Sequence, residues 1–114
     1  MKSPVDHISF RVFSISELRS FFHSLISVLD KQVQTVSHGS TWSIYFRDPE
    51  QNRFEIFTDT PWHVDQPCKF DVDLDLPDEK LMAFTHQKIQ QMSGFTHATQ
   101  WQASHKAEFI NSHH

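Results

Sequence analysis

Hydrophobic and polar residues alternate along residues 5–13, near the start of the chain. One side of this segment carries three apolar residues, Ile8, Phe10 and Val12. The other side carries three polar residues, His7, Ser9 and Arg11. A period of two predicts a half-buried β-strand with one polar face, and that polar face is where a pocket could lie.

A helical period follows over residues 15–29, where apolar residues recur every three or four positions. The six residues of this stripe are Leu18, Phe21, Phe22, Leu25, Ile26 and Leu29. The spacing predicts one amphipathic α-helix, and Ser14 followed by Glu17 predicts a capping box at its start. We expect the stripe to pack on the apolar side of the first strand.

Three short strands are predicted next, over residues 32–37, 41–47 and 53–58. The alternation is clearest in the second strand, where Trp42, Ile44 and Phe46 oppose Ser43, Tyr45 and Arg47. Turn-forming residues separate the three strands at 38–40 and at 48–52. The first sixty residues therefore predict the element order β-α-β-β-β.

Prolines and acidic residues interrupt the chain from Asp59 onward, and a weaker helical pattern over residues 78–92 ends at Ser93-Gly94. Proline and carboxylates suit the first turn of such a helix. We therefore expect an α+β fold in two parts. Residues 1–67 form the β-α-β-β-β module, and residues 68–114 form an extension that contains the second helix.

Composition excludes several classes of function. The chain has 114 residues, which suits one domain, and its formal charge of −4 argues against binding to nucleic acid. No apolar run approaches the roughly 18 residues that a membrane span needs. A single cysteine, Cys68, fits a reducing compartment, and we expect a cytoplasmic protein with no membrane partner. Nine histidines raise the question of a metal.

Two metal-ligand residue types lie on the polar faces of predicted strands, His7 and Glu55. Divalent metals such as Fe, Mn, Ni or Zn accept imidazole and carboxylate ligands together, but two ligands bind weakly. A two-fold homodimer would supply two of each. From the residues alone, a histidine on a polar face without a ligand role is the more common case for His7. Glu55 lies in a phenylalanine-rich strand and must be paired or face water.

Three segments resemble the vicinal oxygen chelate superfamily, which includes glyoxalase I, bleomycin resistance proteins and extradiol dioxygenases. They are Asp6-His7-Ile8-Ser9-Phe10, His38-Gly39, and residues 43–55 with Asp48-Pro49-Glu50-Gln51-Asn52 at their turn. The resemblance covers residues 5–67 and leans toward the last module of extradiol dioxygenases. It implies that two β-α-β-β-β modules form one cup around a divalent metal.

The resemblance also implies roles for individual residues. His7 and Glu55 would be metal ligands, His38 would transfer protons, and Tyr45 would hydrogen-bond the substrate. The family's turn has glycine where Gln51 stands. The family takes a further histidine ligand from a preceding module, so we expect two copies of this chain to share the cup.

The expected function is therefore binding of a small oxygen-rich substrate such as a catechol, with extradiol dioxygenase-like or glyoxalase-like (lyase or isomerase) chemistry. Two alternatives stay open. Without the resemblance, His38 is simply a residue of the turn at 38–40, and Tyr45 is an aromatic residue of the sheet with its hydroxyl group at the rim. The chain would then be a non-catalytic small-molecule-binding module or an inactive half-domain.

Overall fold

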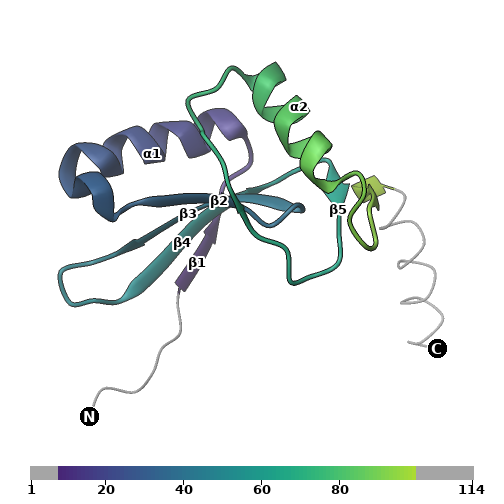
Figure 1. Cartoon of the computed structure of the whole chain (residues 1–114). Helices are drawn as coiled ribbons and strands as arrows, with labels where there is room; N and C mark the ends of the chain where they lie inside the picture. The colour runs from purple at the N-terminus through teal and green to yellow at the C-terminus, as the bar shows by residue number, and fades with distance from the viewer. Residues whose placement is uncertain (1–7, 100–114) are drawn as a thin grey trace, which may run out of the picture.

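A five-stranded mixed sheet forms the centre of the computed structural model, which describes residues 8–99 (Figure 1). Its strands are β1 (Ile8–Arg11), β2 (Gln34–Ser37), β3 (Thr41–Arg47), β4 (Arg53–Asp59) and β6 (Phe70–Asp71). They lie in the order β1-β4-β3-β2-β6; β1 is parallel to β4, and the other neighbours are antiparallel. The fold is α+β, as predicted, and the order strand, helix, three strands is observed. The fifth strand, β6, was not predicted.

Helix α1 (Ile15–Leu29) covers one face of the sheet and continues into a short 3-10 turn, η1 (Asp30–Gln32) (Figure 1). Ser14 caps it as predicted, because its Oγ accepts a hydrogen bond from the Glu17 N–H at 3.0 Å. Leu18 is fully buried, whereas Phe21 is 46% exposed, so the buried stripe is narrower than predicted. A step of about 100° per residue places Phe21 at the margin of that stripe.

The two faces of the sheet differ in chemistry because the side chains alternate along each strand. On the helix face, Ile44 lies opposite Ile56, and both are buried in the core. On the opposite face, called the open face below, Tyr45 lies opposite Glu55, and Ser9 lies on the other side of Glu55. No helix among residues 8–99 lies over the open face in Figure 1.

Helix α2 (Asp78–Ile89) packs on the same face as α1. The Trp42 indole N–H on that face donates to Thr85 Oγ1 of α2 at 2.9 Å, and both residues are buried. The helix ends three residues earlier than the predicted 78–92. A second, two-stranded sheet pairs β5 (Trp62–His63) with β7 (Thr96–His97). None of the helices among the described residues is long and apolar enough to cross a membrane.

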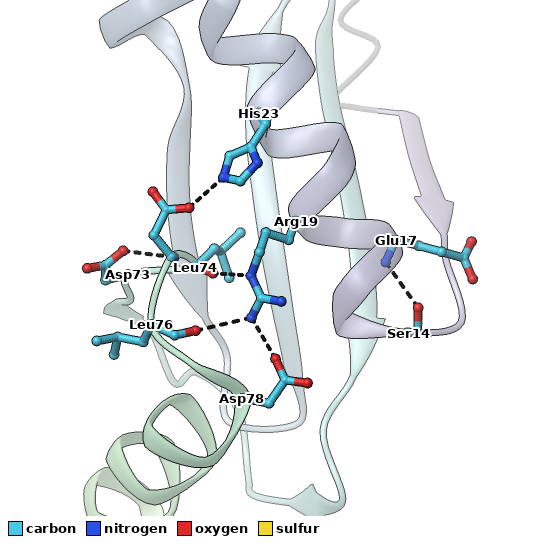
Figure 2. Close-up of polar contacts among 9 residues, drawn as sticks. Ser14, Glu17, Arg19, His23, Asp73, Leu74, Leu76 and Asp78 are labelled. Atoms are coloured by element: carbon cyan, nitrogen blue, oxygen red, sulfur yellow. Dashed lines mark hydrogen bonds and ion pairs between the residues drawn. The ribbon is translucent and has the colours of Figure 1, made fainter.

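Arg19 joins α1 to the segment that leads into α2 (Figure 2). Its guanidinium donates to the backbone carbonyls of Leu74 (2.7 Å) and Leu76 (3.1 Å) and pairs with Asp78 at 2.8 Å. One turn further along α1, His23 Nε2 lies 2.5 Å from Asp75 Oδ1. The planar guanidinium can hold two carbonyls and a carboxylate at once, and it thereby fixes the start of α2 against α1.

Leu18→Ala should lower the free energy of unfolding by about 2–5 kcal/mol, because it leaves a cavity under α1. Val28→Ala is the matched control on the same helix, since Val28 is 80% exposed, and it should change stability by less than about 0.5 kcal/mol. Urea unfolding of the two variants checks this. Equal losses would mean that Leu18 does not carry the packing of α1.

Candidate functional site

Glu55 lies at the centre of the open face and is only 9% exposed. Its Oε1 accepts a hydrogen bond from Ser9 Oγ on β1 at 2.8 Å. Its Oε2 accepts from Ser43 Oγ at 2.8 Å and from the Tyr45 hydroxyl at 3.0 Å, both on β3. The strand register produces this cluster, because Ser9 and Tyr45 are the direct neighbours of Glu55 on the two adjoining strands.

Hydrogen bonds from hydroxyl groups keep the Glu55 side chain ionised. Burial pushes the pKa of the carboxyl upward, since water solvates the ionised form better than the sheet does. Hydrogen bonds from Ser43, Ser9 and Tyr45, and the nearby His38, act in the opposite direction and outweigh burial. The pKa of Glu55 is therefore lowered from its usual value, and the group is a carboxylate at neutral pH.

His38, which follows β2, extends this cluster. Its Nε2 lies 2.7 Å from the Tyr45 hydroxyl, and its Nδ1 lies 2.9 Å from the backbone carbonyl of Cys68. The two rings meet edge to face with their centroids 5.9 Å apart. Cys68 contributes its backbone carbonyl, whereas its thiol lies 3.3 Å from Met92 Sδ; burial raises the pKa of that thiol.

The number of hydrogen bonds that this cluster can form depends on whether His38 is protonated or neutral. A carbonyl oxygen only accepts, so Nδ1 carries the hydrogen in its bond to Cys68. Tyr45 has one hydroxyl hydrogen for two partners, His38 Nε2 and Glu55 Oε2. Protonated His38 donates to Tyr45, which donates to Glu55, and both bonds form. With neutral His38 and ionised Glu55, the tyrosine hydrogen satisfies only one of its two partners. The two arrangements of the row His38–Tyr45–Glu55 therefore differ by one proton.

Tyr45 stays protonated in this row. Burial, the hydrogen bond to Glu55 and the charge of that carboxylate raise the pKa of Tyr45 to about 12. Arg53, whose guanidinium lies 5.2 Å from the centre of the tyrosine ring, acts in the opposite direction but is outweighed. Tyr45 can donate or pass on a proton at neutral pH, but it is not a tyrosinate nucleophile.

Gly39 holds His38 in position. Its φ of 81° is one that residues with a side chain rarely adopt. A Cβ at this position would also collide with the Val64 side chain. Gly39 N–H donates to Ser37 Oγ at 2.9 Å, and Gln66 Nε2 donates to the His38 carbonyl at 2.8 Å. The backbone on both sides of the imidazole is thus tied to the rest of the fold.

A cavity of about 560 Å³ opens beside Tyr45 at the end of the sheet near the β3–β4 turn. Its lining is polar and basic and includes Gln34, Arg47 and Arg53. A small molecule in this cavity would reach Tyr45, the middle member of the proton-carrying row.

The structure brings together three of the four site residues predicted from the sequence, His38, Tyr45 and Glu55. The fourth, His7, lies outside the described residues. Sequence reasoning missed Ser9 and Ser43, the two serines that hold Glu55. Their place on the polar side of the strand alternation was the available signal, but pairing them with Glu55 requires the register between strands.

The described part of the chain does not by itself fit a divalent metal. No group of three or more His, Cys, Asp or Glu side chains among residues 8–99 is arranged to hold an ion. Of the predicted ligands only Glu55 is described, and both of its oxygens accept hydrogen bonds from hydroxyl groups. What residues 8–99 of one copy offer is therefore a hydrogen-bond network around Glu55, and three ligands for a metal are not gathered among them.

Comparisons of the chain with protein-family models, curated proteins and solved structures found no match. The geometry of the site and the sequence motifs are therefore the basis for assigning a function.

Tyr45 is the only tyrosine of the chain, so its ionisation can be followed at 295 nm without interference from other tyrosines. After a rapid pH jump to 11, less than half of Tyr45 should ionise in the folded protein, whereas most should ionise in urea, where the pKa returns to about 10. Stability should accordingly fall as pH rises between about 10 and 12, because the folded state holds the proton more tightly.

Glu55→Gln is the matched variant for this titration. It removes the carboxylate charge, which contributes to the raised pKa of Tyr45, and should lower that pKa toward 10. A titration that is the same with and without the carboxylate would contradict the described contact between the two residues.

Proposed function

We propose that the open face binds a small oxygen-rich molecule, such as a catechol, and that His38, Tyr45 and Glu55 exchange a proton with it. The observation that carries this proposal is the continuous row from the Cys68 carbonyl through His38 and Tyr45 to Glu55. A buried carboxylate bonded to hydroxyl groups, beside an imidazole, is a common arrangement for acid–base chemistry. The Tyr45 hydroxyl would contact the bound molecule from the wall of the cavity.

The motifs and the element order support a glyoxalase/dioxygenase-like protein as the setting for this chemistry. In that setting the β-α-β-β-β unit is half of a cup. The proposal includes a cytoplasmic location, which the single cysteine supports. No step of the proposed chemistry uses a metal, because the described residues of one copy supply too few ligands.

A second copy of the chain completes the cup in this proposal. Among the described residues β1 pairs only with β4, so its other edge is open. Apolar side chains lie along and beyond this edge: Ile8 is 40% exposed, Phe10 53% and Phe13 83%. An open edge with exposed aromatic residues favours association with another chain. Pairing along β1 would place two open faces side by side.

Binding without chemistry is the second candidate. It is favoured by the lack of a metal-ligand cluster among residues 8–99, since extradiol chemistry needs two histidines and a carboxylate on one metal. The proton-carrying row would then serve only to hold a ligand hydroxyl. Metal analysis of the purified protein, together with a search for a product of catechol, tests this second candidate. About one metal ion per site would count against it, whereas a metal-free protein that binds catechol without changing it would support a binding module or an inactive half-domain.

Sedimentation at micromolar concentration should show a dimer of the 13.4 kDa chain. Phe10→Lys should shift the protein to monomer, because a charge on an edge strand opposes edge-to-edge pairing. Val28→Lys is the control, since Val28 is 80% exposed on α1, and it should leave the dimer intact. A wild-type monomer would rule out the shared cup.

Tyr45→Phe should weaken catechol binding about threefold to tenfold, because it removes one hydrogen bond and keeps the aromatic ring. Calorimetric titration measures the loss, and Ser27→Ala on the exposed side of α1 is the control for removal of a hydroxyl. Unchanged binding in Tyr45→Phe would overturn the proposed site.

With Fe²⁺ loaded anaerobically, the wild type should give little or no yellow ring-opened product from catechol in air, because ring cleavage needs two histidines and one carboxylate on the same metal.

A further inference from the structure

Two arginines lie directly opposite each other on the open face. Arg47 on β3 pairs with Arg53 on β4 in the strand register, next to the Tyr45–Glu55 pair. Like charges in directly opposed positions of a strand pair destabilise it. This arrangement is therefore unfavourable unless an anion binds between the two guanidinium groups.

The other two arginines of the chain are each paired with an aspartate. Arg11 pairs with Asp59 at 2.6 Å, and Arg19 pairs with Asp78 at 2.8 Å. Within residues 8–99, no carboxylate lies within ion-pair distance of Arg47 or Arg53. This is notable in a chain with fourteen acidic residues and a net charge of −4. Asp48, next to Arg47, instead accepts hydrogen bonds from the backbone and side-chain amides of Asn52.

Both guanidinium groups are already held in place. Arg47 Nη1 donates to the carbonyl of Gln51 at 3.0 Å, in a turn where Gln51 has a φ of 68°. Arg53 lies over the ring of Tyr45. A guanidinium has five N–H donors, so each arginine retains donors for a ligand. Holding the groups in advance lowers the entropy that is lost on binding.

The cavity beside Tyr45 connects these observations. Arg47, Arg53, Gln32, Gln34 and Tyr45 all line it, and none of its lining residues is acidic. Carboxylate and phosphate groups match the planar fork of arginine with two parallel hydrogen bonds. The amide groups of Gln32 and Gln34 add further donors on the same wall.

We propose that Arg47 and Arg53 form an oxyanion subsite, so that the molecule bound on the open face is a small organic acid or phosphate ester. This inference deepens the proposed function and rests on it. The anionic end of the ligand lies between the two arginines, and its hydroxyl end lies at Tyr45. The pair thereby selects oxygen-rich molecules that carry a negative charge over neutral ones.

The test compares catechol with its carboxylated analogue, 3,4-dihydroxybenzoate, by calorimetry at low salt. The wild type should bind the acid about tenfold more tightly than catechol, as expected for one charge-assisted hydrogen-bonded contact. Arg47→Gln and Arg53→Gln should each remove most of this preference. Arg53→Lys, which keeps the charge, should retain part of it.

Arg11→Gln is the matched control. Arg11 also lies on the open face, 5.2 Å from the centre of the Phe57 ring, as Arg53 lies 5.2 Å from that of Tyr45. The substitution changes the net charge equally and should keep the preference for the acid. Inorganic phosphate, added alone, should shift the Nε–H NMR signals of Arg47 and Arg53 and leave that of Arg11 unchanged.

The outcomes separate this inference from the proposed function. Equal affinities for catechol and the acid, with catechol binding still dependent on Tyr45, would overturn the oxyanion subsite alone. Benzoate binding as tightly as the dihydroxy acid, with no effect of Tyr45→Phe but a loss in Arg47→Gln, would support the subsite and overturn the proposed function. No binding of any of these molecules would overturn both.

Discussion

A buried carboxylate is stable only when its oxygens are hydrogen-bonded, and this requirement on Glu55 determines much of the sheet around it. The groups that meet it come from both neighbouring strands, Ser9 on β1 and Ser43 and Tyr45 on β3. A slip of one residue would place an apolar side chain opposite the carboxylate, Ile8 or Phe10 from β1. The charge on one residue therefore reinforces the alignment of three strands.

The two faces of the sheet differ in what they contribute to the molecule. The helix face carries the core, where Leu18 and Ile44 are fully buried and Trp42 is bonded to Thr85. Arg19 joins the segment before α2 to α1 on that face, as Figure 2 shows. The open face thus needs little apolar packing of its own. Its polar residues can form a cavity and a proton-carrying row without weakening the core.

Local sequence patterns predicted the longer elements well. The period-two and helical patterns gave residues 41–47 and 15–29, which match β3 and α1. The two-residue strands β5, β6 and β7 are too short to show any period, and their partners lie elsewhere in the chain. The partner of His38 could not be predicted either, because Cys68 is thirty positions away and contributes only a backbone carbonyl. Tyr45 and Glu55 were predicted on polar faces, but their direct contact depends on the register that the turn at residues 48–52 imposes.

Gly39 has a consequence for how the chain can vary. Any side chain there would push Val64 away, and Val64 is fully buried in the core. Gly39 also adjoins His38, whose imidazole depends on the position of the neighbouring Cys68 carbonyl. Substitution at this one position would therefore disturb the core and the position of the His38 imidazole together. In a library of random variants, such a site tolerates almost no replacement even though it contributes no functional group, whereas the exposed Val28 on α1 could change freely.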